Sequence, residues 1–236
     1  MRTTRAFVAL ATLLTASNAF AKGSDDTTAM DKQAAPFASL NINLITNYAA
    51  EAGPGASNSS DIFPPPRWIT VGAFTAARYD TNGFPSYADP GPPNRRNNFF
   101  AGGPSNALST ATQTIDVSNL SSVIDSSSTR FKLSGYFGGW EYQDDNAVLN
   151  VSFLNKKKSV LSMVAIGSVL AAERGSRSGL IRKALSGTIP RNTRFIVVSL
   201  VMTRTDGSYN DGYADDLSLI LTKSSKKSTA SRGTGH

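Results

Sequence analysis

The chain has 236 residues, with 24 basic and 17 acidic side chains, one histidine and no cysteine, and its formal net charge is +7. The lack of cysteine excludes disulfide cross-links and thiolate catalysis. The single histidine is His236, so the body of the chain lacks the usual general base for a serine nucleophile and the usual zinc ligand.

The first 21 residues have the organisation of a secretory signal peptide. Two arginines precede an apolar run at 6–14, which is too short to span a bilayer. Ala19 and Ala21 then supply the small residues of a cleavage site. We therefore predict cleavage before Lys22 and an extracellular or periplasmic location. No later run is long and apolar enough for a bilayer, so no transmembrane segment is expected.

The rest of the chain divides into three parts by composition. Residues 22–39 show no hydrophobic period and are predicted to be a linker, residues 40–222 form one domain, and residues 223–236 form a basic, disordered tail. Between residues 22 and 221 the chain holds 18 basic and 17 acidic residues. A nucleic-acid-binding domain concentrates positive charge on its folded surface, so we expect no nucleic-acid partner.

The domain is predicted to be all-β, because short apolar segments alternate with clusters of turn residues. In chain order the predicted strands are 41–47, 68–79 with a break at Gly72, 98–101, 111–117, 130–137, 147–154, 160–166, 180–188, 194–203 and 213–221. Residues 194–202 are apolar at nearly every position, which favours a central strand covered on both sides. Short helices are expected at 118–126 and 169–174. This spacing of strands favours a two-sheet antiparallel sandwich of the jelly-roll type.

Two segments at the ends of this domain resemble a known family. The opening segment is N-L-I-T-N-Y-A-A-E (43–51) and the closing segment is Y-A-D-D-L-S-L (213–219). Together with Trp68 and the strand I-D-V at 115–117, this pairing resembles galactose-binding-like jelly rolls, including the carbohydrate-binding modules of secreted bacterial proteins. Tyr48 departs from the family pattern, in which glycine is usual at this position.

The resemblance implies a structural calcium ion. In that family the opening glutamate and the first aspartate of the closing strand hold the ion together with backbone carbonyls, and these residues correspond to Glu51 and Asp215. The sequence itself places Asn210, Asp211, Asp215 and Asp216 within seven residues, and oxygen ligands at this density suit Ca²⁺, although the spacing is not that of an EF-hand. The alternative is that these aspartates form turns and protect a strand edge.

Loops that interleave aromatic and polar residues are candidates for sugar binding. Pyranose rings stack on aromatic side chains, and their hydroxyls need amide or carboxylate partners. The candidates are Trp140, Tyr142, Gln143 and Asp145 in one loop, Tyr87, Asn97, Asn98 and Phe99 in a proline-rich loop at 83–104, and Tyr209 with Asn210. We expect a monomer that binds an extracellular polysaccharide or glycan. For any one of these aromatic residues the alternative is core packing or anchoring of the loop.

Catalysis would have to rely on a pair of carboxylates, as in glycosidases, because histidine and cysteine are missing from the domain. Glu141 lies close in sequence to Asp144 and Asp145 among aromatic neighbours. We interpret this segment as the acidic tip of a hairpin and predict that the domain is not an enzyme. Two alternatives remain open, namely a structural or adhesive surface protein with the same fold, and a glycan-cleaving enzyme that uses Glu141.

Overall fold

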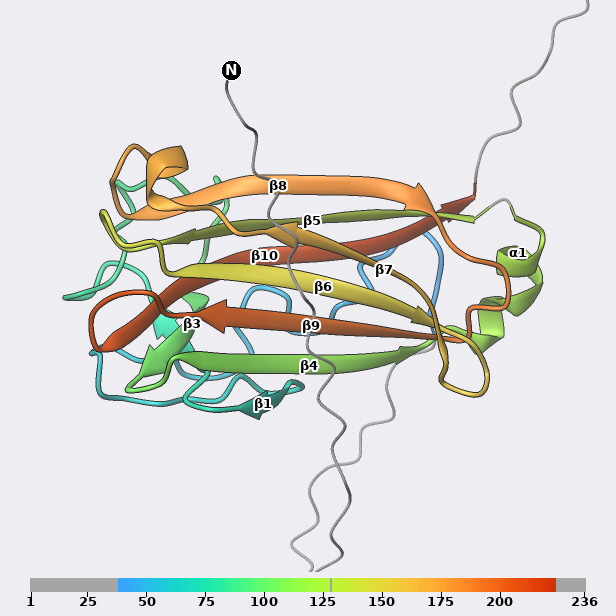
Figure 1. Cartoon of the computed structure of the whole chain (residues 1–236), viewed down its shortest axis with the longest axis horizontal. Helices are drawn as coiled ribbons and strands as arrows, with labels where there is room; N and C mark the ends of the chain where they lie inside the picture. The colour runs from blue at the N-terminus through green and yellow to red at the C-terminus, as the bar shows by residue number, and fades with distance from the viewer. Residues whose placement is uncertain (1–37, 128, 224–236) are drawn as a thin grey trace, which may run out of the picture. The chain divides into compact units, whose positions relative to one another are not determined.

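The computed structural model describes residues 38–127 and 129–223, which contain ten β-strands in two five-stranded antiparallel sheets (Figure 1). We name each sheet after its central strand. The β9 sheet consists, in spatial order, of β1 (Ile69–Val71), β4 (Leu108–Asp116), β9 (Phe195–Thr203), β6 (Asn146–Leu154) and β7 (Val160–Gly167). The β10 sheet consists of β2 (Thr75–Arg78), β3 (Asn98–Pro104), β10 (Tyr209–Lys223), β5 (Thr129–Gly139) and β8 (Gly179–Thr188).

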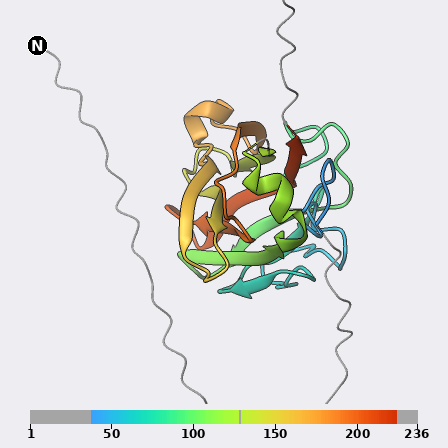
Figure 2. The ribbon, with the colours of Figure 1, turned by 90° about the vertical axis from the view of Figure 1, so that its right-hand side faces the viewer.

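The order of the strands is that of a jelly roll. From β3 to β6 and again from β7 to β10, every connection takes the chain from one sheet to the other, and only β2–β3 and β6–β7 are neighbours in both sequence and sheet. The prediction of an all-β two-sheet antiparallel sandwich is therefore confirmed. The predicted short helices are also present, as η1 (Ser118–Leu120) with α1 (Ser121–Asp125), and as η2 (Ala171–Arg174). Figure 2 views the molecule from the side that carries α1.

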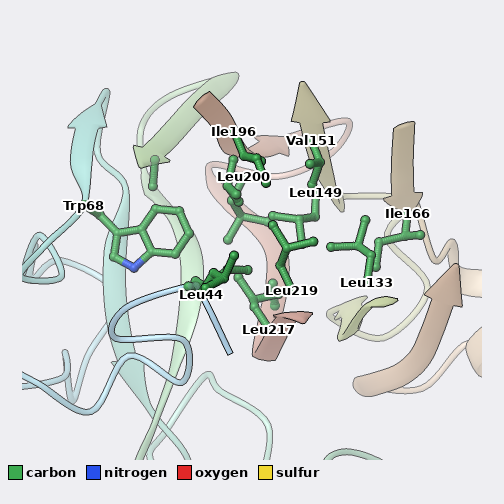
Figure 3. Packing of buried hydrophobic residues seen from close by; sticks show 14 of the residues in the cluster. Leu44, Trp68, Leu133, Leu149, Val151, Ile166, Ile196, Leu200, Leu217 and Leu219 are labelled. Carbon is green, nitrogen blue, oxygen red and sulfur yellow. The ribbon is translucent and has the colours of Figure 1, made fainter. Parts of the chain in front are cut away.

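The main core lies between the sheets and follows from the two-residue period of the strands. In β6, Leu149, Val151 and Phe153 are fully buried, whereas the residues between them are only half-buried. In β9, Ile196, Val198, Leu200 and Met202 point inward in the same way. Figure 3 shows side chains from both sheets meeting Leu44 and Trp68 in this layer. The outward residues of β9 are half-exposed, so the expectation that β9 is covered on both sides is not met by the described residues.

A second apolar cluster lies on the outer face of the β10 sheet. Tyr79, Phe84, Phe99, Leu180 and Tyr213 form its centre. The long loop that joins β2 to β3 supplies Tyr79 and Phe84. Their rings lie 4.7 and 5.8 Å from the ring of Phe99 in β3, and these contacts hold the loop against the sheet. The loop predicted at 83–104 is therefore anchored through part of its length, and its last residues belong to β3.

The predicted strand at 41–47 is wrong in one respect, because only Asn43 forms a β-bridge, with Ile220. Positive φ angles at Asn41 and Asn47 interrupt the extended conformation that a ladder requires. Backbone hydrogen bonds still hold the segment along the end of β10, where Leu44 N–H donates to the Leu219 carbonyl. We refer to residues 41–48 as the opening segment.

Ala38 is buried in the core, so the domain includes residues before position 40. The predicted signal peptide, most of the linker and most of the basic tail lie outside the described residues. Within residues 38–127 and 129–223, no helix has the length and hydrophobicity that are needed to cross a bilayer.

Candidate functional site

A groove with a volume of about 380 Å³ opens on the outer face of the β10 sheet. Its floor is made by residues that alternate with the core positions of β5 and β10, so that Leu133 and Leu219 point inward while Ser134, Tyr136 and Ser218 point outward. The residues that line it are Asn43, Tyr48, Pro93, Asn94, Ser134, Gly135, Tyr136, Arg182, Asp216 and Ser218.

Three separate parts of the chain form the walls of this groove. The opening segment supplies Asn43 and Tyr48, the loop between β2 and β3 supplies Asn94, and β8 supplies Arg182. In the sheet, Arg182 lies directly opposite Tyr136. The groove therefore depends on contacts between residues that are far apart in the sequence.

A bulge in β10 separates two neighbouring aspartates. The register between β10 and β5 shifts between Asp215 and Ser218, and Asp216 has a φ angle of 49°. Asp215 is consequently buried, while Asp216 is exposed and lines the groove. Within the bulge, Leu217 N–H donates to the Tyr48 carbonyl at 3.0 Å, which holds Tyr48 beside the groove.

The wall at Asn43 is fixed by its side-chain amide. Asn43 Nδ2 donates to the Leu217 carbonyl at 2.9 Å, and its Oδ1 accepts the Leu219 N–H at 3.0 Å. This amide replaces part of the missing strand ladder, so the opening segment is tied to β10 through side chain and backbone together. Two tyrosine rings, an arginine, a carboxylate and several amide and hydroxyl groups thus surround one groove on a rigid sheet.

The predicted calcium ligands lie beneath this region. Asp215 is 1% exposed, and its carboxylate accepts the Tyr79 hydroxyl at 2.9 Å and the Asp216 N–H at 2.6 Å. Burial is the main cause that raises the pKa of Asp215 to about 8, and the nearby charges of Asp216 and Glu51 contribute to this rise. Glu51 itself accepts the Asn98 N–H at 2.7 Å. The structure therefore brings the two carboxylates close together, although no group of three or more His, Cys, Asp or Glu side chains suited to a metal occurs among the described residues.

The loop between β5 and β6 differs from its predicted role. Trp140 is half-buried against the outer aromatic cluster, whereas Tyr142 is 67% exposed. The Gln143 side-chain oxygen is buried and has no hydrogen-bond partner among the described residues. The side chain of Arg174 joins this loop to the η2 region, because its guanidinium donates to the carbonyls of Glu141 and Gln143.

Asp145 is fully buried, so the prediction that it contacts a ligand needs correction. Its carboxylate accepts N–H groups from Thr205 at 2.6 Å, Asp206 at 3.0 Å and Asp211 at 2.8 Å. These bonds use both carboxylate oxygens to hold the β9–β10 loop against the β5–β6 loop. Asp145 therefore positions backbone and presents no surface to a sugar.

The proline-rich loop also contains residues that are structural. Phe99 is fully buried, with its ring 5.0 Å from that of Tyr213, which corrects the prediction that it stacks on a ligand. Asn98 is buried, and its amide donates to the carbonyls of Ala50 and Gly53. Tyr87 is 49% exposed, but its hydroxyl donates to the Arg96 carbonyl within the loop.

None of the described residues that line the groove was predicted from the sequence to bind a sugar, and those with the most distinctive chemistry are Tyr48, Tyr136, Arg182 and Asp216. A signal for Tyr136 was present, because the predicted alternation of strand 130–137 places Leu133 and Phe137 inward and Tyr136 outward. Tyr48 had been noted only as a departure from the family pattern. Arg182 had no such signal, since its position depends on the pairing of β5 with β8.

No protein-family model and no curated protein sequence matches the chain. Solved structures with a similar fold include the enzymatically active domain of tailspike protein 4 of bacteriophage CBA120. The two sequences are 14% identical, and the match covers 77% of this chain and 22% of the tailspike chain, with a TM-score of 0.48. The CBM22-1 xylan-binding domain of Xyn10C from Paenibacillus barcinonensis is 10% identical in sequence. The match covers 70% of this chain and 92% of that domain, with a TM-score of 0.38. A cyclase from Fischerella sp. TAU is 17% identical in sequence. The match covers 77% of this chain and 98% of the cyclase chain, with a TM-score of 0.43. The chain thus spans about a fifth of the tailspike chain, and these structures include both a binding module and enzymes.

The buried carboxyl group of Asp211 predicts that stability depends on pH. Burial raises its pKa to about 7, although the hydroxyl of Tyr213 donates to it and opposes the rise. Between about pH 4 and pH 7 the folded protein keeps a proton that the unfolded chain has lost, so the free energy of unfolding falls as pH rises. A pKa change of this size corresponds to about 4 kcal/mol at most.

Chemical denaturation at pH 5 and pH 7.5 measures this dependence. The wild type should be more stable at pH 5, and Asp211→Asn, which keeps an acceptor for Tyr213, should reduce the difference. Without a bound cation Asp215 acts in the same direction up to about pH 8, so part of the difference should remain in calcium-free buffer. Equal stability of the wild type at both pH values would contradict the assignment.

Proposed function

We propose that this protein binds a glycan outside the cytoplasm, without cleaving it, in the groove on the β10 sheet. The observation that supports this most is the pair of tyrosines, Tyr48 and Tyr136, at a groove that is otherwise lined by amide, hydroxyl and charged groups. Aromatic rings offer stacking surfaces to the apolar faces of sugars, and the polar groups match their hydroxyls. The groove volume of about 380 Å³ is in the range of small-ligand sites.

The proposal that binding occurs without catalysis rests on the carboxylates of the groove. Asp216 is the one carboxylate among the described residues that line it, whereas glycosidases use two carboxyl groups on either side of the scissile bond. Arg182 and the hydroxyls of Ser134 and Ser218 serve as hydrogen-bonding groups. The location outside the cytoplasm rests on the predicted signal peptide.

Replacement of Tyr136 by alanine tests the groove. Loss of one stacked ring should weaken glycan binding by about 10- to 100-fold, in line with the energies of aromatic hot spots. A glycan array identifies the ligand, and calorimetry then measures its affinity for Tyr136→Ala and Tyr48→Ala. Thermal melting checks that each variant remains folded.

The matched control is Tyr142→Ala, which removes an exposed tyrosine that does not line the groove. It should bind the glycan like the wild type. Loss of binding in Tyr142→Ala, with binding retained in Tyr136→Ala, would place the site in the β5–β6 loop instead. Release of sugar from the bound glycan would contradict binding without cleavage.

We also propose a structural calcium ion at Glu51 and Asp215. Two neighbouring carboxylates, one of them buried, repel each other unless a cation or a proton compensates their charge, and this donor set fits Ca²⁺ if backbone carbonyls complete it. The ion would supply charge compensation and would link the chain near the opening segment to β10. The hydrogen bonds from Asn98 and Tyr79 would orient the two carboxylates.

Thermal melting with EDTA and with added calcium tests this proposal. EDTA should lower the melting temperature, and calcium at a hundredfold excess over its Kd should restore about 2.7 kcal/mol of stability. Asp215→Asn, which can still accept the Tyr79 hydrogen bond, should abolish the response, while the control Asp211→Asn should keep it. An identical melting curve with and without EDTA would contradict the proposal of a bound calcium ion.

A further inference from the structure

The outer face of the β9 sheet is almost free of charge. The register aligns its outward residues in rows across the strands, such as Ile69, Thr112, Ser199, Asn150 and Ala165. The rows on either side contain valine, threonine, serine and methionine in the same way. Asp116 is the one charged outward residue on the described strands, and it lies at the end of the face. Lys158 lies over the ring of Phe195 at that same end.

The outer face of the other sheet has the opposite character. Arg130, Lys132 and Arg182 point outward from β5 and β8, and Asp216 is exposed on β10. These three positive charges against one negative charge make the face net positive, and the like net charge opposes association of the β10 sheet with a copy of itself. The neutral surface is therefore a specific feature of the β9 sheet.

Large apolar side chains on the neutral face are open to solvent. Ile69 is 75% exposed, Val71 66% and Met163 58%. Along the edge of the face, β7 has eight residues without charge or proline, whereas β8, the corresponding edge of the other sheet, contains Arg182 and Lys183. Natural proteins protect exposed edges and apolar faces by charge, by proline or by a partner, and among the described residues none of these protects this face.

We infer that the outer face of the β9 sheet pairs with the same face of a second copy of this chain. At about 4.8 Å between strands and about 3.4 Å per residue, β1 with three residues, β7 with eight and the other three strands with nine each give a face of about 600 Å². Specific interfaces bury about 600 to 1,000 Å² on each partner, so this face reaches the lower end of that range. Without the predicted signal peptide, which contains Arg2 and Arg5, the chain holds 22 basic and 17 acidic residues, a net charge of +5, and this face brings copies together without burying like charges.

The pairing is a closed two-fold dimer in which sheet packs on sheet. Full overlap of the two faces places the axis near Ser199, at the middle of the central strand. This inference differs from the monomer that the sequence predicted. Because the groove lies on the other sheet, the dimer leaves both grooves free on opposite sides, and the inference does not depend on what the groove binds.

Sedimentation velocity of the secreted full-length protein tests the dimer. The wild type should sediment with twice the mass of one chain, and Ser199→Glu, which brings two carboxylates together at the axis, should weaken dimerisation by at least about 100-fold. The matched control is Ser186→Glu, which adds the same charge on the outer side of β8, opposite Lys132. It should remain dimeric. Circular dichroism shows whether both variants are folded.

A second measurement uses the absence of cysteine from the chain. Ser199→Cys should give a covalent dimer with a short bis-maleimide reagent, whereas Ser186→Cys should remain monomeric on a denaturing gel. A monomeric wild type would overturn the inference, and so would a dimer that persists in Ser199→Glu. Assembly into species larger than a dimer would also overturn the inference, because a face that pairs with the same face of one copy cannot contact a third copy.

Discussion

The pairing of β10 with its neighbours is the constraint on which the other features depend. β10 runs for 15 residues, with β3 and then the opening segment on one side and β5 on the other. Its bulge buries Asp215 and exposes Asp216, and the next residue holds the Tyr48 carbonyl. One irregularity in one strand therefore fixes the wall of the groove and the position of a proposed calcium ligand together.

The two outer faces of the sandwich have different chemistry although they belong to sheets of equal size. The β10 sheet is partly covered by an aromatic cluster and a long loop, and next to that cover it presents charged and polar groups around a groove. The β9 sheet has no such cover among the described residues and presents neutral side chains. The proposed recognition surface on one side and the inferred self-association surface on the other are compatible, because the core separates them. A dimer with two grooves would bind a polymeric glycan with avidity.

Much of the fold was predictable because strand formation follows local patterns. The alternation in 147–154 and the turn residues around 155–159 correspond to β6 and the hairpin to β7. The prediction failed at 41–47, where left-handed residues break the ladder and the side chain of Asn43 supplies its bonds. Among the site residues, composition could not distinguish the buried ring of Phe99 from an exposed one, since both occur in loops rich in proline and asparagine.

The sequence by itself determined most of the strands and, in strands such as 130–137 and 147–154, which residues point inward. Only the tertiary structure decided where the groove lies, because Tyr48, Tyr136 and Arg182 come together through pairings between distant strands. It also decided that Asp145 binds backbone N–H groups and that the outer face of the β9 sheet is uncovered. Local patterns fix which side of a strand is apolar, but the register and order of the strands fix which side chains become neighbours.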